Sequence, residues 1–226
     1  MNSNSNIQES DYIASKINAF KSKRLGKIRE IYSGMGRTPI VLHICPEKSF
    51  ITPDNFNVST LKEVIGEEQF CRFLLGIGDV MYRDVKSVLE GIEIQGSLDE
   101  KANQIVSYIR IYKNGVIEIV GTCIPYQSPH SERKVIKTYE KEIWFFFPEY
   151  LEVMKKLGIN STLFVFINLL DVKGLSLPNE REQPFDRDII EVETVIPLSS
   201  FDNPKDMIMP MFDRIWNACG HLKSYA

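Results

Sequence analysis

The segment NQIVSYIRIYKNGVIEIVGTCI, residues 103–124, predicts two antiparallel strands joined by a tight turn. An Asn-Gly dipeptide at positions 114–115 separates two apolar runs, and it is the strongest short hairpin signal that a sequence can carry. Isoleucines alternate along both runs, which predicts that one face of the hairpin lies in a core. On the opposite face, we expect Arg110 or Lys113 to form an ion pair with Glu118 across the two strands.

Helices and further strands are predicted on both sides of this hairpin. Helical spacing covers residues 10–34, a short part of 59–80, 135–158 and 203–218, and strand patterns cover 39–45, 91–97, 161–177 and 185–198. This order predicts an α+β fold, with a mostly antiparallel sheet of about six strands and helices packed against it. Because no Pro/Gly-rich linker or repeat divides the chain, we expect a single domain over residues 10–226, after a polar, disordered tail over residues 1–9.

The aromatic segment WFFF, residues 144–147, admits two interpretations. It could be a strand, but the spacing of the surrounding apolar residues favours a helix. Pro148 is then expected to kink or divide that helix. The aromatic side chains are expected in the core rather than in a surface that stacks on nucleic-acid bases.

Size, composition and charge are those of an ordinary globular protein. The chain has 226 residues, of which 43% are hydrophobic and 25% charged, and its net charge is −3. This charge argues against a protein whose whole surface binds nucleic acid. No window reaches the roughly 18–20 apolar residues that a membrane span needs, and the first residues do not resemble a secretory signal. We therefore expect a cytoplasmic protein with no membrane partner.

The predicted first helix is the one clearly basic element, because it carries six cations and one anion between Lys16 and Glu30. One interpretation is a helix that binds the phosphates of a nucleic acid. The other is a solvated face whose long side chains cover apolar surface, and this interpretation is favoured. The candidate nucleic-acid-binding residues are Lys16, Lys21, Lys23, Arg24, Lys27 and Arg29.

A polar face of the sheet is a second candidate surface. His43 lies inside an apolar run and is expected to point away from Leu42 and Ile44, as a structural residue. With the polar residues of the hairpin it would form a face that a partner protein could contact. The residues of this face are His43, Arg110, Tyr112, Lys113 and Glu118.

The residue types of catalytic and metal sites do not fall into a recognisable motif. The four cysteines include no CxxC pair and are expected to be small buried residues, and no GxSxG, HExxH or P-loop motif is present. Asp186 and Asp188 could hold a divalent cation, although Arg187 between them favours a surface charge cluster. The sequence therefore predicts no cofactor, no metal and no catalytic residue, and a non-enzymatic protein is the favoured interpretation.

The C-terminal stretch MFDRIWNACGHLKSYA, residues 211–226, places Cys219 close to His221, as in half of a catalytic or metal site. The alternative is the end of a helix, which Gly220 terminates in the left-handed conformation. A thiolate is disfavoured at the C-terminus of a helix, so the second interpretation is favoured. The helix is then expected to pack against the rest of the domain and stabilise it, and its structural residues are Trp216, Asn217 and Gly220.

Five motifs follow one another along the chain: INAFKSKRLGKI, TPIVLHICPEKSF, YIRIYKNGVIEIV, FDRDIIEVETVI and MFDRIWNACG. In this order they resemble the C-terminal region of bacterial proteins whose N-terminal part is an Alba-like, Schlafen-type DNA-binding domain, a group also described as ATP-binding or helix-turn-helix proteins. The resemblance spans residues 13–224, and it departs from the family pattern of Arg, Pro and Leu at Lys113, Val192 and Ile215. It implies an accessory C-terminal domain without the upstream DNA-binding domain, associated with defence loci or mobile elements.

Three functions are compatible with these patterns. The first, which is favoured, is a non-enzymatic accessory, interaction or sensor module of a bacterial complex, in contact with a partner protein or a second copy of itself. The second is a nucleic-acid-associated accessory subunit that uses the basic helix. The third is a hydrolase built on His43, Cys219 or the pair Asp186 and Asp188.

Overall fold

The computed structural model of this chain describes residues 3–53, 55–65, 82–98, 105–128, 132–136, 139–178, 183–197 and 203–221. The strands of its main sheet are β1 (Thr38–Pro46), β2 (Tyr82–Val88), β3 (Gly91–Ser97), β4 (Ile105–Tyr112), β5 (Ile117–Cys123), β8 (Leu163–Leu170) and β9 (Ile189–Ile196). They form a seven-stranded antiparallel sheet in the order β2-β3-β4-β5-β1-β8-β9. A separate ribbon pairs β6 (Tyr126–Gln127) with β7 (Lys134–Val135).

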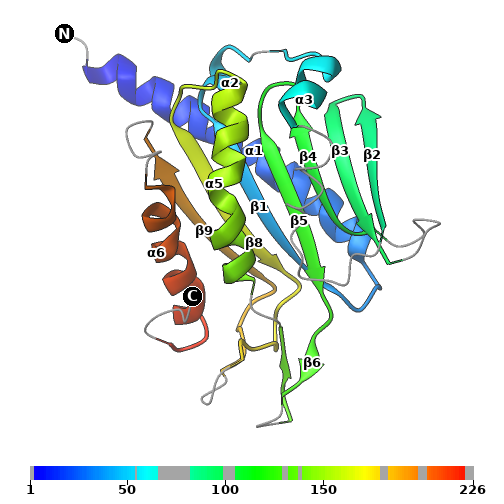
Figure 1. Cartoon of the computed structure of the whole chain (residues 1–226). Helices are drawn as coiled ribbons and strands as arrows, with labels where there is room; N and C mark the ends of the chain where they lie inside the picture. The colour runs from blue at the N-terminus through cyan, green and yellow to red at the C-terminus, as the bar shows by residue number, and fades with distance from the viewer. Residues whose placement is uncertain are drawn as a thin grey trace.

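Helices cover both faces of this sheet (Figure 1). They are α1 (Ser3–Tyr32), α2 (Lys48–Ile51), α3 (Val58–Ile65), α5 (Glu140–Lys156) and α6 (Pro204–Asn217). Figure 1 shows α5 and α6 in front of the sheet and the long helix α1 crossing behind it. The predicted α+β class, with helices packed on a mostly antiparallel sheet, is confirmed.

The two faces of the sheet differ in chemistry. The face towards α5 and α6 holds the main hydrophobic core, which includes Leu42 and Ile44 of β1. The face towards α1 holds two smaller apolar clusters, and His43 is buried on this face. The predicted orientation of His43, away from its two apolar neighbours, is therefore confirmed. Polar residues on the α1 face must find partners inside the protein, because the helix excludes water from them.

The hairpin of β4 and β5 forms as predicted. Ile109 and Ile111 lie opposite Ile119 and Ile117 in the register of β4 and β5. Gly115 has a φ of 88°, which a residue with a side chain rarely adopts. The sequence predicted about six strands, and of the seven strands in the main sheet it missed β2. This edge strand reads YRDVKSV and lacks the apolar alternation that marks a buried strand. The sequence also predicted a loop in the segment of the short β6–β7 ribbon.

Two helices differ from the expectation in their extent. Helix α1 begins at Ser3, within the segment that the sequence predicts to be disordered. Helix α5 continues through Pro148 as one element and includes the WFFF segment, so the helix interpretation of that segment is confirmed. Within the described ranges, none of the helices has the length and apolarity needed to cross a membrane.

Candidate functional site

A cluster of charged and polar side chains lies between α1 and the sheet, centred on Glu118. The Glu118 side chain is fully buried, and it accepts hydrogen bonds from Arg24 Nε at 2.8 Å and from Arg24 Nη2 at 2.7 Å. The Tyr108 hydroxyl donates to the same carboxylate at 2.9 Å. His43 Nε2 lies 2.9 Å from Glu118 Oε2, and since an ionised carboxylate only accepts, Nε2 carries the proton in this hydrogen bond.

The strand register explains which of these groups meet. Glu118 lies directly opposite His43 on β1 and opposite Arg110 on β4. Arg110, however, donates from Nε to Glu93 Oε2 at 2.6 Å, and Glu93 is its neighbour on the other side, on β3. The predicted ion pair between Arg110 and Glu118 is therefore wrong, because Arg24 reaches Glu118 from α1 instead.

The environment of Glu118 fixes its charge. Burial alone would raise the pKa of this carboxyl, but the hydrogen bonds from His43 and Arg24 outweigh burial and hold the pKa well below its ordinary range. Glu118 is therefore ionised in the folded protein at neutral pH. A buried carboxylate of this kind is tolerated only with its cation and its hydrogen-bond donors in place.

Stability should depend on pH through Glu118. Because the folded-state pKa is depressed, the contribution of this group is fully present above its ordinary pKa of 4.5 and is lost as the pH falls below that value. We expect the stability difference between the wild type and Glu118→Gln to shrink as the pH is lowered from about 6 to about 3, by up to about 1.4 kcal/mol per pH unit. Urea unfolding at each pH measures it. A difference that stays constant over this range contradicts a depressed pKa.

The six candidate phosphate-binding residues of α1 divide into two groups. Arg24, Lys21 and Arg29 form ion pairs with Glu118, Glu191 and Asp171, which lie 94 to 170 residues away in the sequence. Lys16, Lys23 and Lys27 are exposed. Lys16 donates a hydrogen bond to the Phe50 carbonyl. Binding of nucleic acid through α1 stays a prediction, for which three exposed lysines remain.

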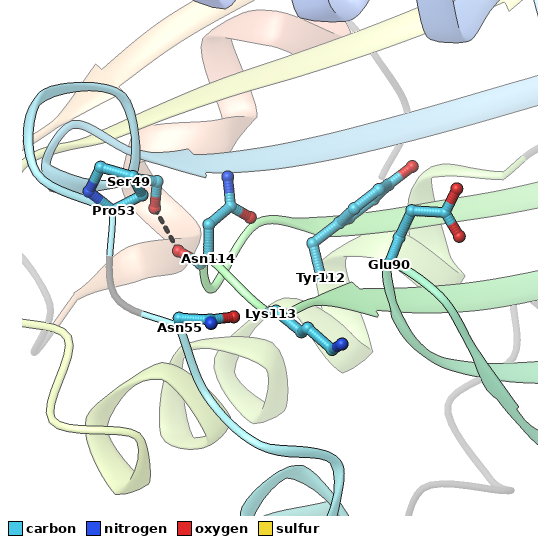
Figure 2. Close-up of a pocket in the computed structure, with 7 residues that line it drawn as sticks. All are labelled: Ser49, Pro53, Asn55, Glu90, Tyr112, Lys113 and Asn114. Atoms are coloured by element: carbon cyan, nitrogen blue, oxygen red, sulfur yellow. Dashed lines mark hydrogen bonds between the residues drawn. The ribbon is translucent and has the colours of Figure 1, made fainter.

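The predicted polar sheet face lies largely under α1. His43 and Glu118 have no exposed surface, and Tyr112 is 8% exposed. In this position α1 covers these three residues, so they contact the helix and not a partner protein. Lys113 lies at the end of β4, where its side chain borders a surface hollow (Figure 2).

The candidate hydrolytic residues are not brought together. Cys219 is buried, and burial raises the pKa of its thiol to about 12. Asp186 forms an exposed ion pair with Arg187, as the sequence suggested, and the described part of the chain contains no cluster of three metal-ligating side chains. Cys45 and Cys123 are buried free thiols, as predicted, whereas Cys71 lies outside the described residues.

The predicted anchor at the C-terminal end is buried. Trp216 is 1% exposed, and its indole Nε1 donates to Glu140 Oε1 at 2.7 Å. Gly220 has the predicted left-handed conformation, with a φ of 78°. No sequence pattern predicts the contact with Glu140, which lies 76 residues away at the start of α5.

Two of the surface hollows lined by described residues bear on function. One, of about 410 Å³, lies at the end of the β4–β5 turn, and its walls include Ser49, Asn55, Glu90, Tyr112, Lys113 and Asn114 (Figure 2). The other, of about 490 Å³, lies between α5 and α6, and its walls include Trp144, Pro148, Leu151, Asn203, Lys205 and Asp206.

Aromatic side chains are exposed beside the second hollow. Trp144 is 38% exposed and Phe145 is 64% exposed, whereas Phe147 and Tyr150 of the same helix are buried. Within WFFF, the prediction that the aromatic residues lie in the core is therefore correct for Phe147, which is buried, and for Phe146, which packs partly buried against the core, and wrong for Trp144 and Phe145.

Comparison with protein-family models, curated proteins and solved structures finds no match to this chain. The resemblance to the C-terminal region of the Alba-like, Schlafen-type proteins therefore stays a prediction from short motifs.

Proposed function

We propose that this chain is a non-enzymatic interaction module that contacts another protein chain through the exposed face of α5. The observation that carries this proposal is the exposed aromatic pair Trp144 and Phe145 on that helix. Large aromatic side chains are costly to leave in water, and they dominate binding energy when a partner covers them. The motif resemblance to an accessory domain agrees with this role.

The charges around the aromatic pair indicate the class of partner. Lys205 places its ammonium 3.5 Å from the centroid of the Trp144 ring. Glu152 and Lys155 form an ion pair about two to three turns further along α5. Asp206 adds a further negative charge at the hollow. An apolar centre with a rim of both signs is typical of a protein interface. A surface for nucleic acid or for anionic lipid would carry a single positive sign.

A second copy of this chain meets the same requirement. Because cations and anions lie on one patch, the patch can be complementary to itself across a two-fold axis. The hollow beside Trp144 has Pro148 and Leu151 in its walls, and it could receive an apolar side chain from the facing copy. The contact that we propose is therefore a symmetric one, through α5 of two copies.

Substitution of Phe145 by serine should weaken self-association. We expect the wild type to form a dimer in sedimentation velocity, and we expect Phe145→Ser to raise its dissociation constant by about 30-fold, the effect of losing one central aromatic contact. Leu89→Ser is the matched control, since Leu89 is 85% exposed in the turn between β2 and β3.

Two outcomes overturn the proposal. If Phe145→Ser and Leu89→Ser associate as strongly as the wild type, α5 is not the contact. If the wild type stays monomeric at millimolar concentration, self-association is excluded. A photo-crosslinking residue at position 145 then tests for a different partner protein in cells, with position 89 as the background, and equal capture at both positions removes the α5 surface altogether.

A further inference from the structure

The hollow in Figure 2 has a frame that the backbone fixes. The Lys113 amide donates to the Glu90 carbonyl at 2.8 Å, and the Phe56 amide donates to the Lys113 carbonyl at 2.8 Å. Ser49 Oγ donates to the Asn114 carbonyl at 2.6 Å. Three segments that are distant in sequence are thereby tied together around the β4–β5 turn, so the walls are formed before any ligand arrives.

Two opposite charges border this hollow without neutralising each other. No ion pair of Glu90 or Lys113 is found among the described residues, and Figure 2 draws no bond between them. Neither the Asn55 side chain nor the amide nitrogen of Asn114 has a hydrogen-bond partner in the described part of the chain. In Figure 2 these amides lie on the Ser49 side of the hollow, and Glu90 lies beyond Tyr112. The hollow therefore offers a hydrogen-bonding cation, an anion and two amides.

The geometry points to a binding site for a small zwitterion, a molecule that carries an ammonium and a carboxylate as a free amino acid does. Lys113 can donate to the carboxylate of such a ligand, and Glu90 can accept from its ammonium. The side-chain amides of Asn55 and Asn114 can form hydrogen bonds with the rest of the ligand. The volume of about 410 Å³ lies within the range of small-molecule sites. This site is independent of the α5 surface.

Other small ligands fit these walls less well. A phosphate would meet the like charge of Glu90, and a simple cation would meet that of Lys113. A sugar would need the open face of an aromatic ring to stack on. The Tyr112 ring already contacts two cations, because the guanidinium carbons of Arg110 and Arg24 lie 5.8 Å and 5.9 Å from its centre. The charges of Glu90 and Lys113 are therefore the groups of this hollow that can recognise a ligand.

Nuclear magnetic resonance titration tests the site with free L-amino acids, each beside its N-acetyl and its carboxamide derivative. We expect at least one amino acid to shift the backbone signals of Lys113 and Asn114 at millimolar concentration or below. Loss of either charge, by derivatising the ligand, should weaken binding about tenfold or more. Lys113→Ala and Glu90→Gln should weaken it equally, and Lys86→Ala, which removes an exposed lysine of β2, should not.

The possible results separate this proposal from its alternatives and from the proposed function. If no free amino acid shifts these signals, or if an N-acetyl or carboxamide derivative binds as well as its parent, the zwitterion site is wrong. Binding through the carboxylate alone would indicate the C-terminus of a peptide, and binding through the ammonium alone would indicate an N-terminus. Phe145→Ser should bind the amino acid as the wild type does, so failure at one surface leaves the other standing.

Discussion

Glu118→Ala lowers the free energy of unfolding by about 3–5 kcal/mol, the usual cost of removing one member of a buried ion pair. The substitution leaves the Arg24 guanidinium between α1 and the sheet without its anion, and it removes the acceptor of the His43 hydrogen bond. It also leaves a space that the packed interface cannot fully close. Urea unfolding at pH 7, followed by circular dichroism, measures the loss.

A surface carboxylate of the same sheet provides the control. Asp84 pairs with Lys86 on β2, and both side chains are about half exposed, so Asp84→Ala should cost about 0.5 kcal/mol or less. The double variant Arg24→Met with Glu118→Leu should be more stable than Glu118→Leu alone, because it buries no unpaired guanidinium. A loss below about 1 kcal/mol for Glu118→Ala would show that the cluster contributes little to the attachment of α1.

The elements predicted correctly are those with a local signal. The hairpin around Gly115 has its own turn dipeptide, and α1 ends near a glycine with a φ of 75° at position 34. Strand β2 carries no such signal, because an edge strand is half solvated and its alternation is polar. Local patterns therefore identify the core of the sheet better than its edge.

The ion pairs of α1 could not be predicted, although every residue in them is visible in the sequence. Arg24 and Glu118 are 94 residues apart, and only the crossing of α1 over β5 brings them together. The same six cations would fit a phosphate-binding surface equally well, because a sequence does not show which side of a helix faces the sheet's carboxylates. Burial is what separates Lys21 and Arg24 from Lys23 and Lys27.

The exposed aromatic residues were missed for a related reason. Helical spacing identifies one apolar stripe, and in α5 the stripe with Phe147 and Tyr150 faces the core. Trp144 and Phe145 lie outside that stripe and have no place in the core. An aromatic residue is expected to be buried when only its type is considered. An aromatic residue outside the apolar stripe of its helix instead indicates a contact surface. This distinction is available from sequence once the stripe is placed.

Trp216→Ala lowers the free energy of unfolding by about 5 kcal/mol, because it removes the largest side chain of the core and leaves the Glu140 carboxylate without its indole donor. Trp216→Phe keeps most of the volume and should cost about 2 kcal/mol, the share of the lost hydrogen bond. Leu89→Ala provides the control at an exposed apolar position away from α5, with an expected change within about 0.5 kcal/mol. Urea unfolding gives all three values.

The loss in Trp216→Phe should also grow with pH. Burial raises the pKa of Glu140, and the hydrogen bond from Trp216 opposes that rise, so its removal lets the pKa rise further. A carboxyl with a raised folded-state pKa loses its stabilising contribution as the pH increases from its ordinary value of 4.5 through the folded-state pKa. The deficit should therefore be larger at about pH 8 than at about pH 5, and Glu140→Gln in the same background should abolish the difference. A deficit that is independent of pH would mean that the indole contributes volume alone.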